Sequence, residues 1–206
     1  MVKVITYVDG FNLYFGLRDS GYKRYYWLNI RTLAQKLLML NQELIMTKYF
    51  TSRIIDAPEK EKRQSTYIEA LQTLCDFNDF ELYYGHYRRD PFRCPRCRNT
   101  SEIPNEKMTD VNIATEMLLD AVNNRFDIAL LISADSDLVP PIKAIKTHYP
   151  EKRVTVAFPP RRYSADLEHA ASSSFHISRA KIAQSRFPER VMKTDGFVLE
   201  RPSEWS

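Results

Sequence analysis

Apolar positions recur along this chain in short β-branched or aromatic runs, which alternate with longer stretches of helical periodicity. The short runs predict strands over 2–8, 44–51, 80–87, 127–132 and 153–158, and a last short strand over 175–177. The helical stretches cover 12–20, 29–40, 58–77, 108–122, 140–148 and 166–171. This alternation indicates an α/β fold with a mostly parallel central sheet flanked by helices on both faces.

Two parts of the chain depart from the alternation. Residues 88–105 break the pattern and predict a basic, cysteine-containing loop inserted into the domain. Residues 186–206 show no strong period and predict a C-terminal tail, either an arm or disordered. That leaves residues 1–185 as one domain, which suits a chain of 206 residues.

Composition narrows the class of protein. Hydrophobic residues make up 44% of the chain and the net charge is only +4, so the balance is that of a globular protein with a mild preference for polyanions. The longest clean apolar run, 128–132, is far too short to span a membrane. The N-terminus lacks the features of a signal peptide. Three cysteines are too few for a disulfide scaffold, so we expect a reducing, cytoplasmic setting.

Carboxylates follow two of the predicted strands, at the edge where open parallel sheets bind ligands. Asp9 follows the first strand, with Asn12 one turn further on, and Asp135 and Asp137 follow the fourth strand. Asp110 is different, because it heads a helix face whose other members are apolar. A carboxylate buried there requires a cation or hydrogen-bond donors.

Each carboxylate also has a simpler interpretation. Asp135 or Asp137 could cap the following helix, Asp9 could merely end its strand, and Asp110 could be a first-turn acid favoured by the helix dipole. Together, however, four independent coincidences would have to converge on one edge of the sheet. Carboxylates held that close repel one another unless a divalent cation neutralises them, and oxygen ligands suit Mg²⁺ or Mn²⁺.

The same residues resemble the NYN domain family of PIN-like ribonucleases. Three motifs carry the resemblance, in the family's order and within about residues 1–177: Asp9-Gly10-Phe11-Asn12, Lys107-x-x-Asp110 and Ser133-x-Asp135-Ser136-Asp137. The resemblance implies a PIN-like Rossmannoid fold and an endoribonuclease that hydrolyses RNA at a Mg²⁺ or Mn²⁺ site, leaving 5′-phosphate and 3′-hydroxyl ends.

The resemblance also implies roles for individual residues. The metal ligands and catalytic carboxylates would be Asp9, Asp110, Asp135 and Asp137. Asn12 would hold water or a phosphate oxygen, and Ser133 would fix a neighbouring carboxylate. Lys107 would pair either with the scissile phosphate or with a carboxylate of the site.

Other functions have less support in the sequence. A phosphatase of the haloacid dehalogenase kind needs Asp-x-Asp, but residue 11 is Phe, and the glycine-rich motifs of dinucleotide and nucleotide binding are missing. A catalytically weak RNA-binding regulator of the same fold gains nothing from concentrated negative charge. A small-molecule enzyme acting on aromatic rings is a further alternative, although no flavin or haem signature is found.

A basic segment follows the third predicted strand. Its arginines are interleaved with aromatic residues, a combination suited to phosphate contact and base stacking: Arg88, Arg89, Arg93, Arg96 and Arg98. A flexible basic loop without a fixed ligand is equally compatible with this composition. A second basic cluster could complete a positive channel to the carboxylates: Lys152, Arg153, Arg161 and Arg162.

Cys94 and Cys97 have the spacing of half a zinc site. The other ligands would come from His86 or Cys75, or from a second subunit in a homodimer. Two free thiols are the alternative. The aromatic residues Tyr22, Tyr25, Tyr26 and Trp27 could stack bases, although packing under a loop is their commoner use.

Overall fold

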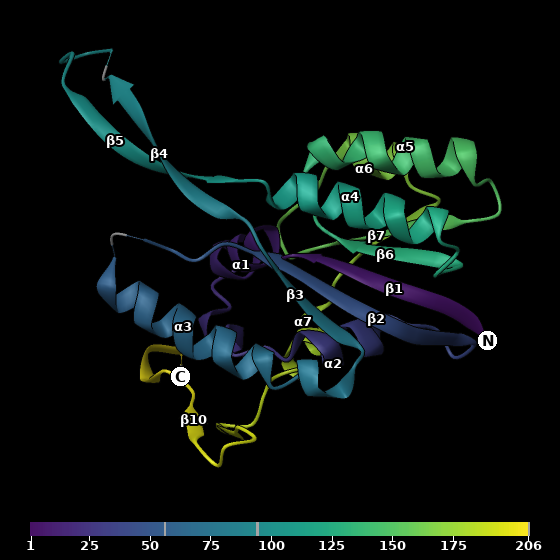
Figure 1. Ribbon diagram of the computed structural model, residues 1–206, viewed down its shortest axis with the longest axis horizontal. Coiled ribbons are helices and arrows are strands. Elements are labelled where there is room, and N and C mark those ends of the chain that lie inside the picture. The colour runs from purple at the N-terminus through teal and green to yellow at the C-terminus, as the bar shows by residue number, and fades with distance from the viewer. Residues whose placement is uncertain (56, 94, 206) are drawn as a thin grey trace.

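A sheet of six parallel strands forms the centre of the protein (Figure 1). The computed structural model describes residues 1–55, 57–93 and 95–205, without the side chains of 87–90 and 101–106. The strand order is β3-β2-β1-β6-β7-β8. These strands are β1 (Val2–Asp9), β2 (Gln42–Thr51), β3 (Phe80–Tyr84), β6 (Ile128–Ile132), β7 (Arg153–Phe158) and β8 (Ser173–His176). The order reverses between β1 and β6, and ligands bind at this switch point in such sheets.

Helices cover both faces of the sheet (Figure 1). One face carries α1 (Gly10–Asp19), α2 (Ile30–Leu37), α3 (Pro58–Gln72) and α7 (Arg179–Ala183). The other face carries α4 (Thr109–Val122), α5 (Val139–His148) and α6 (Ala165–Ala170). Alternate residues of β1 enter the two apolar clusters, Val4 and Val8 on one face and Ile5 and Tyr7 on the other. The predicted α/β fold with a parallel, doubly covered sheet is confirmed.

Local signals placed several elements correctly. Asn29 caps α2, because its side chain accepts a hydrogen bond from the Thr32 backbone N–H at 2.8 Å. Ile113, Met117 and Ala121 on α4 are fully buried, as the predicted apolar stripe requires. Short 3₁₀ turns complete the connections: η1 (Lys23–Tyr25), η2 (Cys75–Phe77), η3 (Ser136–Leu138) and η4 (Ser203–Trp205).

The loop predicted over 88–105 is wrong. The chain forms two antiparallel strands there, β4 (His86–Arg93) and β5 (Thr100–Lys107), and this ribbon projects away from the sheet (Figure 1). The single strand predicted over 80–87 therefore ends at Tyr84. The ribbon strands form a two-stranded sheet of their own, and their sequences lack the alternation of apolar residues that reveals most strands.

Of the two alternatives predicted for residues 186–206, an arm or disorder, disorder is wrong for residues 186–205. This segment contains a small antiparallel pair, β9 (Arg190–Met192) and β10 (Val198–Glu200). Trp27 donates its indole N–H to the Pro188 carbonyl at 2.7 Å, and Trp205 lies edge-on to Tyr67 with ring centroids 6.0 Å apart. Single aromatic anchors fix the segment, and isolated anchors give no periodic signal.

No helix in the described part of the chain has both the length and the apolar character needed to cross a membrane.

Candidate metal centre

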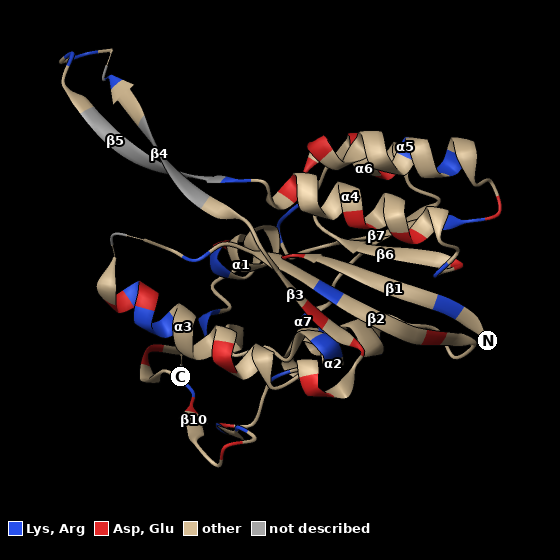
Figure 2. Ribbon diagram, in the orientation of Figure 1, with Lys and Arg blue, Asp and Glu red and all other residues tan. Residues whose placement is uncertain are grey.

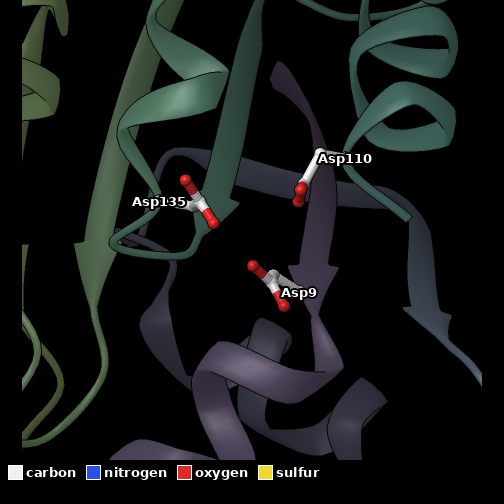
Figure 3. A group of neighbouring side chains, drawn as sticks. All are labelled: Asp9, Asp110 and Asp135. Carbon is white, nitrogen blue, oxygen red and sulfur yellow. The ribbon is translucent and has the colours of Figure 1, made fainter. Parts of the chain in front are cut away.

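Three carboxylates from different elements converge at the switch point of the sheet (Figure 3). Asp9 ends β1, Asp110 lies in the first turn of α4, and Asp135 follows β6. One ligand oxygen from each side chain lies within 4.8 Å of the other two. Three of the four carboxylates predicted to meet there are therefore brought together.

Asp9 is the most tightly held member of this carboxylate group. One of its oxygens, Oδ1, accepts a hydrogen bond from the Asn12 backbone N–H at 2.9 Å. The other, Oδ2, accepts from the Asn12 side-chain amide at 2.8 Å and from the Ser133 hydroxyl at 2.9 Å. Because each carboxylate oxygen offers about two acceptor positions, these bonds fill Oδ2 and leave one position on Oδ1.

Burial and hydrogen bonding act in opposite directions on Asp9, which is only 3% exposed. Desolvation raises the pKa of its carboxyl, the hydrogen bonds from Asn12 and Ser133 lower it, and the charge of Asp135 raises it further. Desolvation dominates, so the net shift is upward. The ionised form of Asp9 is thus incompletely compensated by the protein, and a cation would stabilise it.

Ser133 connects two of the carboxylates. Its hydroxyl donates to Asp9 and accepts a hydrogen bond from the Asp135 backbone N–H at 3.1 Å. Asp135 in turn accepts from the backbone N–H of Asp137 at 3.0 Å, which starts the turn η3. Asp135 therefore caps the 3₁₀ turn η3 and not α5, the helix that it was suggested to cap, whose N-cap is Leu138. One oxygen of Asp135 serves this turn while the residue belongs to the carboxylate group.

Asp137 lies outside this group, and Lys107 is close to it in sequence. The side chain of Asp137 is exposed, and only its backbone contacts Asp135 among the hydrogen bonds described. Lys107 is exposed at the last position of β5, three residues before Asp110. Both lie close in sequence to the carboxylate group, but their predicted roles stay predictions.

A buried polar network, which the sequence analysis missed, fixes the helix that carries Asp110. The Lys48 side chain on β2 is fully buried, and its ammonium lies 2.7 Å from carboxylate oxygens of both Glu116 and Asp120 on α4. The Tyr7 hydroxyl donates to Asp120 at 2.6 Å. The sequence did contain a signal for this network. Lys48 lies in a strand that was predicted to be covered on both faces, and two acids lie four residues apart on a predicted helix.

The predicted basic surface is only partly assembled. Lys and Arg residues gather at the tip of the ribbon (Figure 2), where the side chains of Arg93, Arg96 and Arg98 are exposed. The side chains of Arg88 and Arg89 lie outside the described residues.

The second predicted cluster does not form one channel. Lys152 is 4% exposed and donates to Asn124 and to the Phe126 carbonyl. Lys152 directly precedes β7 and Arg153 is the first residue of that strand, whereas Arg161 and Arg162 follow it. Lys152 and Arg153 therefore lie at the sheet edge opposite the carboxylates, and the prediction that they flank the site is wrong.

The two described cysteines, Cys75 and Cys97, lie in different parts of the fold. Cys97 is exposed near the tip of the ribbon, and Cys94 lies outside the described residues. His86 pairs with Lys107 at the base of the ribbon, and Cys75 precedes β3. Seven residues of strand span about 23 Å, so neither His86 nor Cys75 reaches Cys97. Zinc binding and a homodimer that would complete such a site stay predictions.

An aromatic-lined cavity of about 780 Å³ opens between α1, α3 and the C-terminal segment. It begins beside the carboxylate group, because Gly10 directly after Asp9 and Thr51 at the end of β2 both line it. Its walls are mostly apolar and include Phe11, Tyr14, Phe15, Tyr26, Tyr67 and Trp205. Of the predicted aromatic patch, Tyr26 faces this cavity, whereas Tyr25 and Trp27 are buried in the core.

Gly10 allows the cavity and the carboxylate group to adjoin. A Cβ atom at this position would lie 2.6 Å from the Tyr49 hydroxyl and 2.7 Å from the Phe50 carbonyl oxygen, so no larger residue fits without displacing the backbone. Burial, followed by the charge of Asp9, raises the pKa of the Tyr49 hydroxyl well above its usual range. Tyr49 is therefore a neutral phenol packed beneath the site.

Comparisons with known proteins agree with this architecture. The NYN domain family matches residues 3–179. A curated relative from Pseudomonas putida (strain DSM 28022 / S16), named 6-hydroxy-3-succinoylpyridine 3-monooxygenase HspA, is 28% identical over 97% of this chain and 74% of its own. A crystal structure of a protein of unknown function from Vibrio parahaemolyticus RIMD 2210633 covers 86% of this chain and 94% of its own, with a TM-score of 0.55 and 20% identity. This structural likeness supports the fold alone.

Proposed function

This chain belongs to the NYN domain family, and we propose that it is a ribonuclease that hydrolyses RNA phosphodiester bonds at a Mg²⁺ or Mn²⁺ site. The observation that carries the proposal is the convergence of Asp9, Asp110 and Asp135 at the switch point of the sheet. Nuclease-type folds with such an acidic group act through divalent cations. The carboxylate oxygens of this group are suitable ligands for such a cation.

The donor set fits a hard divalent cation. All three groups are carboxylates, and Mg²⁺ and Mn²⁺ prefer oxygen ligands. Asp9 would use Oδ1, because its Oδ2 is filled by Asn12 and Ser133. The bound ion would polarise a phosphate oxygen and lower the pKa of a bound water.

The protein's own residues would prepare the site for the reaction. Asn12 and Ser133 fix the rotamer of Asp9, and the buried Lys48 network fixes α4 and with it Asp110. Water would attack the phosphorus, and the bond to the 3′ oxygen of the preceding nucleotide would break. The products would be a 5′-phosphate and a 3′-hydroxyl end.

The ribbon would supply part of the RNA-binding surface. Three exposed arginines near its tip offer planar, permanently charged groups for phosphate contact: Arg93, Arg96 and Arg98. Lys107, between the ribbon and Asp110, would lie close to the scissile phosphate. RNA is accordingly the partner that we propose.

The test is incubation of the purified protein with labelled single-stranded RNA, first with EDTA and then with Mn²⁺. Cleavage should depend on the ion, and circular RNA should also be cut if the enzyme is an endonuclease. If RNA is bound with no cleavage in any divalent ion, the protein is an RNA-binding regulator and the proposal is wrong.

A second candidate function is the oxidation of a small aromatic ring. Two observations favour it, the name of the Pseudomonas relative and the aromatic-lined cavity beside the carboxylates. The 28% identity to that relative is shared across the fold and does not by itself transfer the activity. Consumption of a hydroxypyridine together with a two-electron donor and O₂, with no RNA cleavage, would favour this candidate instead.

A further inference from the structure

We infer that the aromatic-lined cavity is a nucleobase pocket, which holds the base of a nucleotide next to the scissile phosphate. The inference deepens the proposed function and rests on it for the identity of the substrate. The proposed occupant is a base of single-stranded RNA, and three features of the cavity support this choice.

The first feature is continuity with the carboxylate group. Gly10 lines the cavity and follows Asp9 directly, and Thr51 lines it from the end of β2, where Phe50 pairs with Asp9. A phosphate held at the carboxylates would therefore place a neighbouring base at the cavity entrance.

The second feature is the kind of surface that the cavity presents. Tyr14 is 40% exposed on α1, with its ring centroid 5.1 Å from that of Tyr26 and 5.4 Å from that of Phe15. Tyr67 and the buried Trp205 also line the cavity, and the ring centroid of Trp205 lies 5.8 Å from that of Tyr26. A partly exposed ring such as that of Tyr14 is a stacking platform for bases, whereas rings used only for stability are normally buried.

The third feature is positive charge at the rim. Lys60 on α3 and Lys23 in η1 are exposed and line the cavity. Within the part of the chain that the structure describes, no ion pair engages either side chain. Arg63 also lines the cavity, but it pairs with Glu204 at 2.8 Å. Lysines at the rim of an apolar cavity match a ligand with a flat ring and an attached phosphate.

The cavity has room for a base and is held in shape by polar contacts. Its volume of about 780 Å³ lies within the range of typical ligand pockets. Gln64 donates to the Ser52 carbonyl at 2.9 Å and accepts from the Ile54 backbone N–H at 2.7 Å. These bonds tie the segment after β2 to α3, so Ile54 and Ile55 form a fixed wall.

The experiment measures stacking directly and in the absence of cleavage. The probe is a five-nucleotide single-stranded RNA with 2-aminopurine at its centre, titrated with the full-length protein in EDTA. Stacking in the cavity should quench the 2-aminopurine fluorescence. Stacking of a base on one aromatic residue contributes substantially to the affinity for RNA. Tyr14→Leu should therefore weaken binding of the probe about fivefold or more. Ile55→Trp, which fills the cavity, should abolish the quenching.

Matched variants separate the cavity from general effects. Lys60→Ala should weaken binding, whereas Lys62→Ala on the same helix, outside the cavity lining, should not. Tyr163→Leu removes a tyrosine that is 53% exposed and does not line the cavity, and it should leave the quenching unchanged. Thermal unfolding of each variant shows whether the fold is retained.

Three results would overturn the inference. They are absence of quenching by the parent protein, quenching that survives both Tyr14→Leu and Ile55→Trp in folded protein, and displacement of the probe by pyridine-3-carboxylate as readily as by AMP. Because the titration contains no metal, its outcome is independent of hydrolysis. Stacking without cleavage in Mn²⁺ would contradict only the ribonuclease proposal, whereas cleavage without stacking would contradict only the nucleobase pocket.

Discussion

Asp110→Ala tests whether the carboxylate at the head of α4 is a metal ligand or a simple first-turn acid. Two carboxylate charges within 4.8 Å of each other repel by roughly 3 kcal/mol or more at an effective dielectric constant of about 20. Asp110 is half-buried, so only part of that repulsion acts. The helix dipole contributes about 0.3–1 kcal/mol in the opposite direction. The variant should therefore be as stable as the parent without metal, or slightly more stable.

Calorimetric titration with Mn²⁺ distinguishes the two roles. Loss of a charged ligand should weaken Mn²⁺ binding by about tenfold or more, because even the loss of a residue that supports a ligand typically costs that much. Asp166→Ala is the matched control, since this aspartate is an exposed first-turn acid of α6 and does not belong to the carboxylate group. Parental Mn²⁺ affinity in Asp110→Ala would refute the reasoning and remove Asp110 from the site.

Three further predictions concern stability and binding. Burial raises the pKa of the Asp9 carboxyl in the folded protein. In EDTA, the stability that the protonated carboxyl contributes is therefore full below the unfolded-state pKa and is lost as pH rises through the folded-state pKa. Urea unfolding over a pH series should show this loss in the parent protein and not in Asp9→Asn. Lys48→Met leaves Glu116 and Asp120 without their buried cation and should lower the free energy of unfolding by about 3–5 kcal/mol; a change below 1 kcal/mol would contradict the role of the network. Alanine at the three described arginines of the ribbon tip should weaken RNA binding and flatten its dependence on salt, and an unchanged slope would exclude the ribbon from the RNA path.

The sequence predicted the sheet and the carboxylate group for a common reason. Burial on both faces imposes continuous apolar strands, and a chain that leaves such a strand at its carboxyl end places the next polar residue at the ligand-binding edge. Asp9 and Asp135 follow from this rule. Asp110 follows from a helix face that is apolar except at its first turn.

The features that the sequence did not predict lack a repeating apolar pattern. The two strands of the ribbon pair with each other and lie outside the six-stranded sheet, and without an alternating apolar pattern their sequences predict a loop. The C-terminal segment is fixed by a few aromatic anchors such as Trp205, which are far apart in sequence from their partners. The cavity depends on the same long-range packing, because α1, α3 and Trp205 meet only in the folded chain.

The most direct test of the ribonuclease proposal is the single-turnover rate of RNA cleavage in Mn²⁺ by the parent protein, Asp9→Asn and Asp135→Asn. Both variants should retain the fold and bind RNA, yet each should lose about a hundredfold or more in rate, because metal-assisted stabilisation of the transition state amounts to several kcal/mol. The products of the parent should carry 5′-phosphate ends. Cleavage at the parental rate by either folded variant, or cleavage by the parent that persists in EDTA, would contradict a metal-dependent reaction at these carboxylates.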